Sequence, residues 1–283
     1  MGANRITKIA ISNIWNKYDL VWNDLHPDVN IVVGINGSGK TTIFRIIDSI
    51  MKADVKALKS YGVSVEVTVE GHAPIIYTPK TSQIDLKRQL VGINYCKIAT
   101  FDVPLRDRSA NSKNFSQLYS ELYNLVYDIA GEESSLSDYR LMATNYPEKA
   151  AHINKRIQAF FATVDRLFEG TGKKISINRQ NNRLVFTDGD EIIELHQLSS
   201  GEKQLLLVLL KVFLMDEEPY ILLMDEPEIS LHIEWQHRFF EEIRQLNPNT
   251  QIITSTHSPS IFADGWGDKL IFISDMFSLA DNK

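Results

Sequence analysis

The stretch from Gly34 to Thr42, Gly-Ile-Asn-Gly-Ser-Gly-Lys-Thr-Thr, constrains the fold of this chain more than any other. It fits G-x-x-x-x-G-K-[ST], the phosphate-binding P-loop, in which glycines let backbone N–H groups surround a phosphate. Residues 30–33 before it are typical of a short buried strand, and residues 42–51 after it have helical apolar spacing. The alternative is a glycine-rich turn that happens to precede a lysine, and it would not require this strand and helix.

The residue types in the motif indicate what it can hold. The start of the helix adds a favourable dipole and unpaired N–H donors for an anion. Lys40 can reach the β- and γ-phosphates of a nucleotide, and the Thr41 hydroxyl can bind Mg²⁺. We therefore expect nucleotide to be bound by Asn36, Gly37, Ser38, Gly39, Lys40, Thr41 and Thr42.

Composition narrows the class of protein. The chain has 283 residues, 43% of them hydrophobic, which allows one large globular domain or two small ones. A net charge of −6 argues against a protein that mainly coats nucleic acid, although it leaves a local basic groove open. The single cysteine, Cys96, rules out an internal disulfide and is predicted to be buried. No apolar run could span a bilayer and residues 1–5 do not resemble a signal peptide, so we expect a cytoplasmic protein.

Periodicity predicts a mixed α/β chain. Two-residue alternation predicts half-buried strands at 6–12 and 63–69, and residues 17–22 could form another strand. Residues 74–78 are expected to pair with 63–69, which gives an antiparallel layer there. Helical spacing from Phe115 to Phe168 predicts a small helical lobe. Further strands are expected at 174–178, 184–187 and 191–195.

Two regions allow more than one interpretation. Residues 80–114 are polar and are predicted to be irregular. Their cluster of Arg106, Arg108 and Lys113 is typical of a solvated loop, and a nucleic-acid or partner contact is the less favoured alternative. Trp15 and Tyr18 lie close to the P-loop in sequence, where an aromatic ring can cover an adenine, but a role in the core or in a hairpin explains them equally well.

Three later segments carry further chemistry. Ser199 and Glu202 form a capping-box pattern ahead of an apolar helix, whose start could bind an anion or simply cap a core helix. The apolar strand 220–225 ends in acids, which suits Asp225 as a Mg²⁺ ligand and Glu226 as a base for water. The strand 251–255 is followed by His257, which can donate to a γ-phosphate.

The order of these motifs resembles that of ABC-type ATPases, most closely the soluble branch of SMC, RecF and OLD-type proteins. The resemblance covers nearly the whole chain and rests on five ordered motifs: the P-loop, Leu198–Glu202, Asp225–Glu226, Ser230–His232 and Ser255–Ser258. Four stretches are also similar to short bacterial AAA ATPases: residues 100–104, residues 198–204, residues 225–228 with 231–232, and residues 247–257. Those ATPases are often encoded in phage-defence or mobile-element operons beside a separate effector. The link to such operons is an analogy with the family.

The resemblance implies a single α/β domain over 1–283, with a mixed sheet around the P-loop helix. Residues 1–104 and 171–283 would form the nucleotide-binding core, and 105–170 the helical lobe. It implies ATP and Mg²⁺ as cofactors, with Thr41 and Asp225 as metal ligands and Glu226 as catalytic base. His257 would be the switch histidine.

The resemblance also implies a head-to-tail homodimer with ATP at the interface. The turn Ser199-Ser200-Gly201 of one subunit would close on the γ-phosphate held by Lys40 of the other, and Ser230 would make a contact across the dimer. Ser200 departs from the pattern because it stands where the first signature glycine is usual. The glutamine that couples the lobes to Mg²⁺ has only Gln83 and Gln89 as candidates.

Three functions fit such an ATPase. We favour a soluble engine that hydrolyses ATP and controls an effector, for example a nuclease, in anti-phage defence. A DNA-repair clamp is the first alternative, but it would suit longer coiled arms or a strongly basic face. The second alternative is the nucleotide-binding subunit of a membrane transporter, and the short helical lobe argues against it.

Overall fold

The computed structural model describes residues 4–98, 116–128 and 134–280. The chain divides into two compact units, of which the first comprises residues 1–99, 218–228 and 249–283 and the second comprises 100–217 and 229–248. The segment 100–104 and the cluster of Arg106, Arg108 and Lys113 lie outside the described residues.

A five-stranded parallel sheet forms one layer of the first unit, in the order β12-β3-β11-β10-β6. Its strands are β3 Val29–Val33, β6 Tyr95–Ile98, β10 Tyr220–Asp225, β11 Thr250–Thr256 and β12 Leu270–Phe272. The register pairs Asp225 with Ser255 and Thr256 with Val33. Because the pairs are parallel, β3, β11 and β10 all end at the same edge of the sheet.

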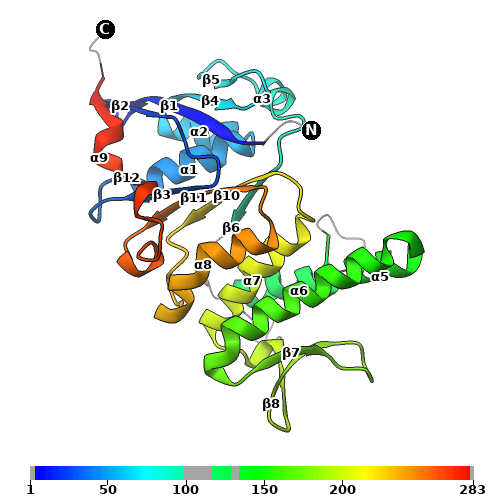
Figure 1. The fold of residues 1–283 in the computed structure, drawn as a ribbon. Coiled ribbons are helices and arrows are strands. Elements are labelled where there is room, and N and C mark those ends of the chain that lie inside the picture. The colour runs from blue at the N-terminus through cyan, green and yellow to red at the C-terminus, as the bar shows by residue number, and fades with distance from the viewer. Residues whose placement is uncertain (1–3, 99–115, 129–133, 281–283) are drawn as a thin grey trace, which may run out of the picture. The chain divides into compact units, whose positions relative to one another are not determined.

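An antiparallel sheet forms the second layer, in the order β13-β2-β1-β4-β5. Its strands are β1 Ile6–Ile14, β2 Tyr18–Asn23, β4 Ser64–Val69, β5 Ile75–Tyr77 and β13 Phe277–Leu279. Helix α1, Lys40–Met51, lies between the two sheets, where Ile43, Ile47 and Ile50 are buried (Figure 1). This unit also contains helices α2 Val55–Tyr61, α3 Gln83–Gln89 and α9 Ile273–Met276. The predicted α/β architecture around the P-loop helix is confirmed.

The prediction that residues 80–114 are irregular is wrong for residues 83–89 and 95–98, which form a helix and a strand. Helix α3, Gln83–Gln89, begins at Ser82, whose side chain caps it by accepting from Asp85 N–H. Strand β6 joins the parallel sheet beside β10, and Tyr95 and Lys97 both bind Asp48 of α1, at 2.9 and 3.0 Å. Strand β6 forms because it pairs with the distant strand β10. Its four residues do not alternate between apolar and polar side chains, so no sign of a strand is visible in the sequence here. Cys96 on this strand is half-buried rather than buried.

In the second unit, the described residues form five α-helices that pack with a three-stranded antiparallel sheet. These are α4 Gln117–Tyr127, α5 Leu136–Asn145, α6 Ala150–Phe168, α7 Ser200–Leu214, α8 Ile233–Leu246, β7 Lys174–Ile177, β8 Leu184–Asp188 and β9 Glu191–Glu194. Aromatic contacts join the elements, such as Phe160 to Phe213 at 4.8 Å and Phe168 to Phe186 at 5.1 Å between ring centroids. No helix among the described residues combines the length and the apolar character that crossing a membrane requires.

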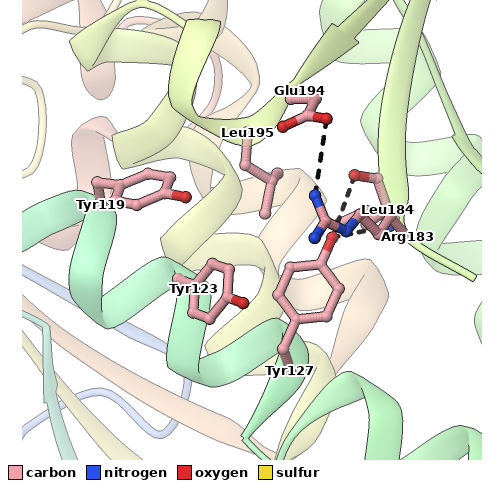
Figure 2. Close-up of a pocket in the computed structure, with 7 residues that line it drawn as sticks. All are labelled: Tyr119, Tyr123, Tyr127, Arg183, Leu184, Glu194 and Leu195. Carbon is pink, nitrogen blue, oxygen red and sulfur yellow. Dashed lines mark hydrogen bonds and ion pairs between the residues drawn. The ribbon is translucent and has the colours of Figure 1, made fainter. Parts of the chain in front are cut away.

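A small pocket lies between α4 and the β8–β9 hairpin within this unit (Figure 2). Three tyrosines spaced four residues apart on α4 form one wall, and the lining residues are Tyr119, Tyr123, Tyr127, Arg183, Leu184, Glu194 and Leu195. The Tyr127 hydroxyl accepts from Leu184 N–H at 2.9 Å and donates to Leu184 C=O at 3.3 Å. It therefore fixes the start of β8 to the helix.

Tyr127→Phe should lower the free energy of unfolding by about 1–3 kcal/mol, because it leaves the Leu184 main chain without this partner. Tyr123→Phe is the matched control: its side chain is 44% exposed, and we expect a change within about 0.5 kcal/mol. Urea unfolding followed by circular dichroism measures both. Equal effects of the two substitutions would contradict the role given to the Tyr127 hydroxyl.

Candidate nucleotide-binding site and signature turn

The P-loop connects the end of β3 to the start of α1 in the first unit. Gly37 and Gly39 have φ angles of 79° and 98°, in the left-handed region that favours glycine. Gly39 is also the N-cap of α1, so the helix begins at Lys40 with unsatisfied N–H groups directed at the loop. The strand, loop and helix expected from the sequence are therefore present at the expected residues.

Lys40 lies inside this loop. Its side chain is only 4% exposed, and Nζ donates to Gly34 C=O at 2.9 Å and to Ile35 C=O at 3.3 Å. Burial lowers the pKa of Lys40, while the carboxylates of Glu226, Asp225 and Glu228 act in the opposite direction. Those carboxylates are thus close enough to Lys40 to form one electrostatic cluster with it.

Ser38 offers a second polar group in the loop. Its Oγ is buried and has no hydrogen-bond partner among the described residues. A buried hydroxyl without a partner is costly, and an anion with free oxygens would satisfy it. Together with the helix N-terminus and Lys40, this donor set suits a phosphate group.

Trp15 packs directly on the P-loop. A Cβ added to Gly39 would lie 2.4 Å from Cη2 of the Trp15 ring, so that ring covers the glycine. Tyr18 and Phe277 support the ring, with centroid distances of 6.3 and 5.9 Å. Trp15 remains 51% exposed and lies in the turn between β1 and β2, so the hairpin alternative fits it and the core alternative does not. Its ring provides an aromatic surface at the mouth of the loop.

The candidate acids follow β10 at the same edge of the sheet. The Ser255 hydroxyl on the neighbouring strand β11 donates to Asp225 Oδ1, which fixes that carboxylate. Glu226 has φ 54°, and its N–H donates to the carbonyl and the hydroxyl of Ser255 at 3.1 Å each. A non-glycine residue in this conformation costs about 1–3 kcal/mol and is typical of functional sites.

His257 follows β11 and meets the acids. Its Nε2 lies 3.1 Å from Glu226 Oε1. Glu228 holds the same segment, since its Oε1 accepts from Thr256 Oγ1 at 2.7 Å and from His257 N–H at 2.8 Å. The structure therefore brings together Lys40, Asp225, Glu226 and His257, four of the residues that the sequence singled out in this unit.

The signature turn begins α7 in the second unit. Ser199 is the N-cap: its Oγ accepts from Glu202 N–H at 3.2 Å, and Glu202 Oε2 accepts from Ser199 N–H at 2.8 Å. The predicted capping box is confirmed. A Cβ added to Gly201 would lie 2.2 Å from the Ser230 carbonyl oxygen, so only glycine allows this approach.

Lys173 is a neighbour of the turn that the sequence did not indicate. Its Nζ lies 2.6 Å from Glu202 Oε1, and the carboxylate is almost fully buried. Burial alone would raise the pKa of Glu202, but the bonds from Lys173 and Ser199 N–H outweigh it and hold that pKa below its ordinary value. The carboxylate therefore stays charged and keeps the turn in its capped conformation.

The predicted metal site can be tested against the donors present. Within the described part of the chain, no group of three or more His, Cys, Asp or Glu residues could hold a metal ion by itself. Mg²⁺ does not need one, because it is commonly held by one or two protein oxygens, waters and substrate phosphates. The Asp225 carboxylate and the Thr41 hydroxyl supply hard oxygen ligands of that kind.

The coupling glutamine is less well supported. Gln89 uses its amide on the edge strand β5, accepting from Ile76 N–H at 2.6 Å and donating to Ile76 C=O at 3.3 Å. Gln83 is the first residue of α3 and is exposed. Neither makes a contact with the acids or with the P-loop that the structure records.

This arrangement is that of an ABC-type, SMC-like P-loop ATPase. A solved structure titled "Crystal structure of the SmcHead bound to the C-winged helix domain of ScpA" has a TM-score of 0.53 at 13% identity. The superposition covers 92% of this chain and 91% of that one. At this level of identity the similarity shows the fold.

Within that class, the family described as "AAA domain, putative AbiEii toxin, Type IV TA system" matches residues 97–263, and the chain belongs to it. A relative named "Retron Vc95 probable ATPase", from Vibrio cholerae serotype O1 biovar El Tor, is 30% identical over 60% of this chain. An "Uncharacterized ABC transporter ATP-binding protein" of Haemophilus influenzae (strain ATCC 51907 / DSM 11121 / KW20 / Rd) is 40% identical over 29% of the chain. The chain spans 40% and 30% of these two relatives.

Proposed function

We propose that this chain hydrolyses ATP in sites shared between two copies and thereby controls a separate effector in bacterial anti-phage defence. The observation that carries the proposal is the meeting of the P-loop, the two acids and His257 at one edge of a parallel sheet. Phosphoryl transfer needs positioning and charge stabilisation more than covalent chemistry, and these residues supply both.

Each residue has a defined role in this proposal. Lys40, the α1 N-terminus and residues 36–42 hold the phosphates, with the Trp15 ring against the adenine. Thr41 and Asp225 hold Mg²⁺, which would neutralise charge on the phosphate oxygens. Glu226 accepts a proton from the attacking water, and His257 donates to the γ-phosphate once nucleotide draws it away from Glu226.

The second copy completes the site. Ser199, Ser200 and the Gly201 N–H would contact the γ-phosphate held by the partner subunit, since the capped start of α7 presents N–H donors to an anion. The effector remains a class, a separate protein such as a nuclease. The retron relative supports a defence role, and the SmcHead complex is a precedent for a partner protein on this fold.

Complementation between two inactive variants tests the shared site. Lys40→Ala removes a P-loop cation and Ser199→Arg places bulk and charge at the closing surface, so each variant alone should release no phosphate. In a mixed dimer, the P-loop of the Ser199→Arg chain faces the intact turn of the Lys40→Ala chain. The mixture should recover up to about half of the wild-type rate, because only a mixed pair contains an intact site and it has one such site instead of two.

The control mixture combines Lys40→Ala with Glu226→Gln. Both residues serve the nucleotide of their own chain, so every site in that mixture lacks either the cation or the base. It should stay inactive. If the first mixture also remains inactive, the nucleotide site is not shared in the way we propose.

A further inference from the structure

Glu228 is a buried acid at the nucleotide site to which the motifs assign no role. Its side chain is 9% exposed, and it follows Glu226 by two residues. One oxygen, Oε1, accepts from both Thr256 Oγ1 and His257 N–H, at 2.7 and 2.8 Å. The other, Oε2, is buried and has no hydrogen-bond partner among the described residues.

We propose that Glu228 is a positioning residue whose two oxygens have separate tasks. Oε1 fixes the main chain at His257, and through it the His257 ring that lies 3.1 Å from Glu226. Oε2 accepts a hydrogen bond from a water molecule that enters with the nucleotide. The inference rests on the proposed ATP site and assigns a further residue to it.

The first task follows from the geometry around His257. The histidine comes directly after β11, where strand pairing no longer fixes the chain, so its N–H needs a partner outside the sheet. Glu228 provides that partner and also binds the preceding threonine hydroxyl, which in turn accepts from Ser258 N–H at 3.0 Å. One carboxylate oxygen therefore orders three consecutive residues, 256–258.

The second task follows from the cost of an orphaned oxygen. A buried carboxylate oxygen normally has a partner, and an unpaired one signals a missing water, ion or ligand. Glu228 belongs to the same group of charges as Asp225 and Glu226: all three carboxylates act on Lys40, and Glu228 and Glu226 both contact His257. A proton donor is the partner that such an oxygen needs, and the hydration water of a bound nucleotide provides one at this edge of the sheet.

Two substitutions separate the tasks. Glu228→Ala removes both oxygens, so amide hydrogen exchange at His257 in nucleotide-free protein should become faster, and kcat should fall by about 100-fold through misplacement of the ring. Glu228→Gln keeps one acceptor for His257 N–H and replaces the other oxygen with a donor. In that variant the His257 amide should stay protected while kcat falls at least about tenfold with KM for ATP little changed.

Glu70→Gln, in the exposed turn that follows β4, is the matched control and should behave like the wild type in both measurements. Unchanged exchange at His257 in Glu228→Ala would overturn the first task, and a wild-type kcat in Glu228→Gln would overturn the second. If the wild-type chain itself releases no phosphate from Mg-ATP, the proposed function fails instead. The exchange measurement, made without nucleotide, still tests the main-chain role.

Discussion

Lys40→Ala should abolish detectable ATP binding, with a loss of affinity of at least about 100-fold, or roughly 2.7 kcal/mol. Lys40 is the cation of the P-loop, and it is only 4% exposed. Its ammonium group donates to the Gly34 and Ile35 carbonyls. A triphosphate would replace those carbonyls as the acceptor, and charge-assisted bonds of this kind are the strong ones. Alanine leaves the buried phosphate charge without that partner.

Titration with a fluorescent ATP analogue measures the effect. Arg45→Ala is the matched control because it removes one positive charge from the exposed side of the same helix, and its affinity should stay close to that of the wild type. Circular dichroism should show that both variants are folded. Undiminished ATP affinity in Lys40→Ala would remove the P-loop assignment on which every other role in this site depends.

The parts of the site that lie within one short stretch of sequence were predictable. The P-loop, the acids after β10 and the histidine after β11 each combine a strand with a short motif directly behind it. Their meeting follows from one further rule, that parallel strands end at a common edge of the sheet. The capping box at Ser199 and Glu202 could also be recognised, because its two residues are only three positions apart in the sequence.

Contacts between distant segments were not predictable from spacing. Strand β6 exists because it pairs with β10, more than a hundred residues later, and its sequence Tyr-Cys-Lys-Ile has no alternation. Lys173 reaches Glu202 and Trp15 covers Gly39 only after the chain has folded. Glu228 was visible as an acid in the motif, but its bonds to Thr256 and His257 depend on the neighbouring strand.

Glu226→Gln should abolish ATP hydrolysis while ATP binding is retained, with a loss of rate of about 10²–10⁴-fold. Glutamine has the shape of glutamate, and its carbonyl oxygen can still accept a hydrogen bond at the position that lies 3.1 Å from His257 Nε2. It cannot take a proton from water at neutral pH. The backbone at φ 54° is unchanged by this substitution, so the variant should fold normally.

Trapped ATP should also change the oligomeric state. Each γ-phosphate would contact Ser199 and the Gly201 N–H of the opposite chain, and hydrolysis would remove that contact. A ligand that binds the dimer better than the monomer shifts the population toward the dimer. Adding Ser199→Arg to Glu226→Gln should prevent this shift, while ATP binding by a single chain remains.

Sedimentation velocity of Glu226→Gln, with and without Mg-ATP, is the most direct measurement of the shared site. We expect a monomer of 32.3 kDa without nucleotide, a dimer with Mg-ATP, and a monomer under both conditions for the Ser199→Arg double variant. A Glu226→Gln protein that binds ATP and still sediments as a monomer would contradict the shared site. A dimer that forms equally well without ATP would show that another surface joins the two chains.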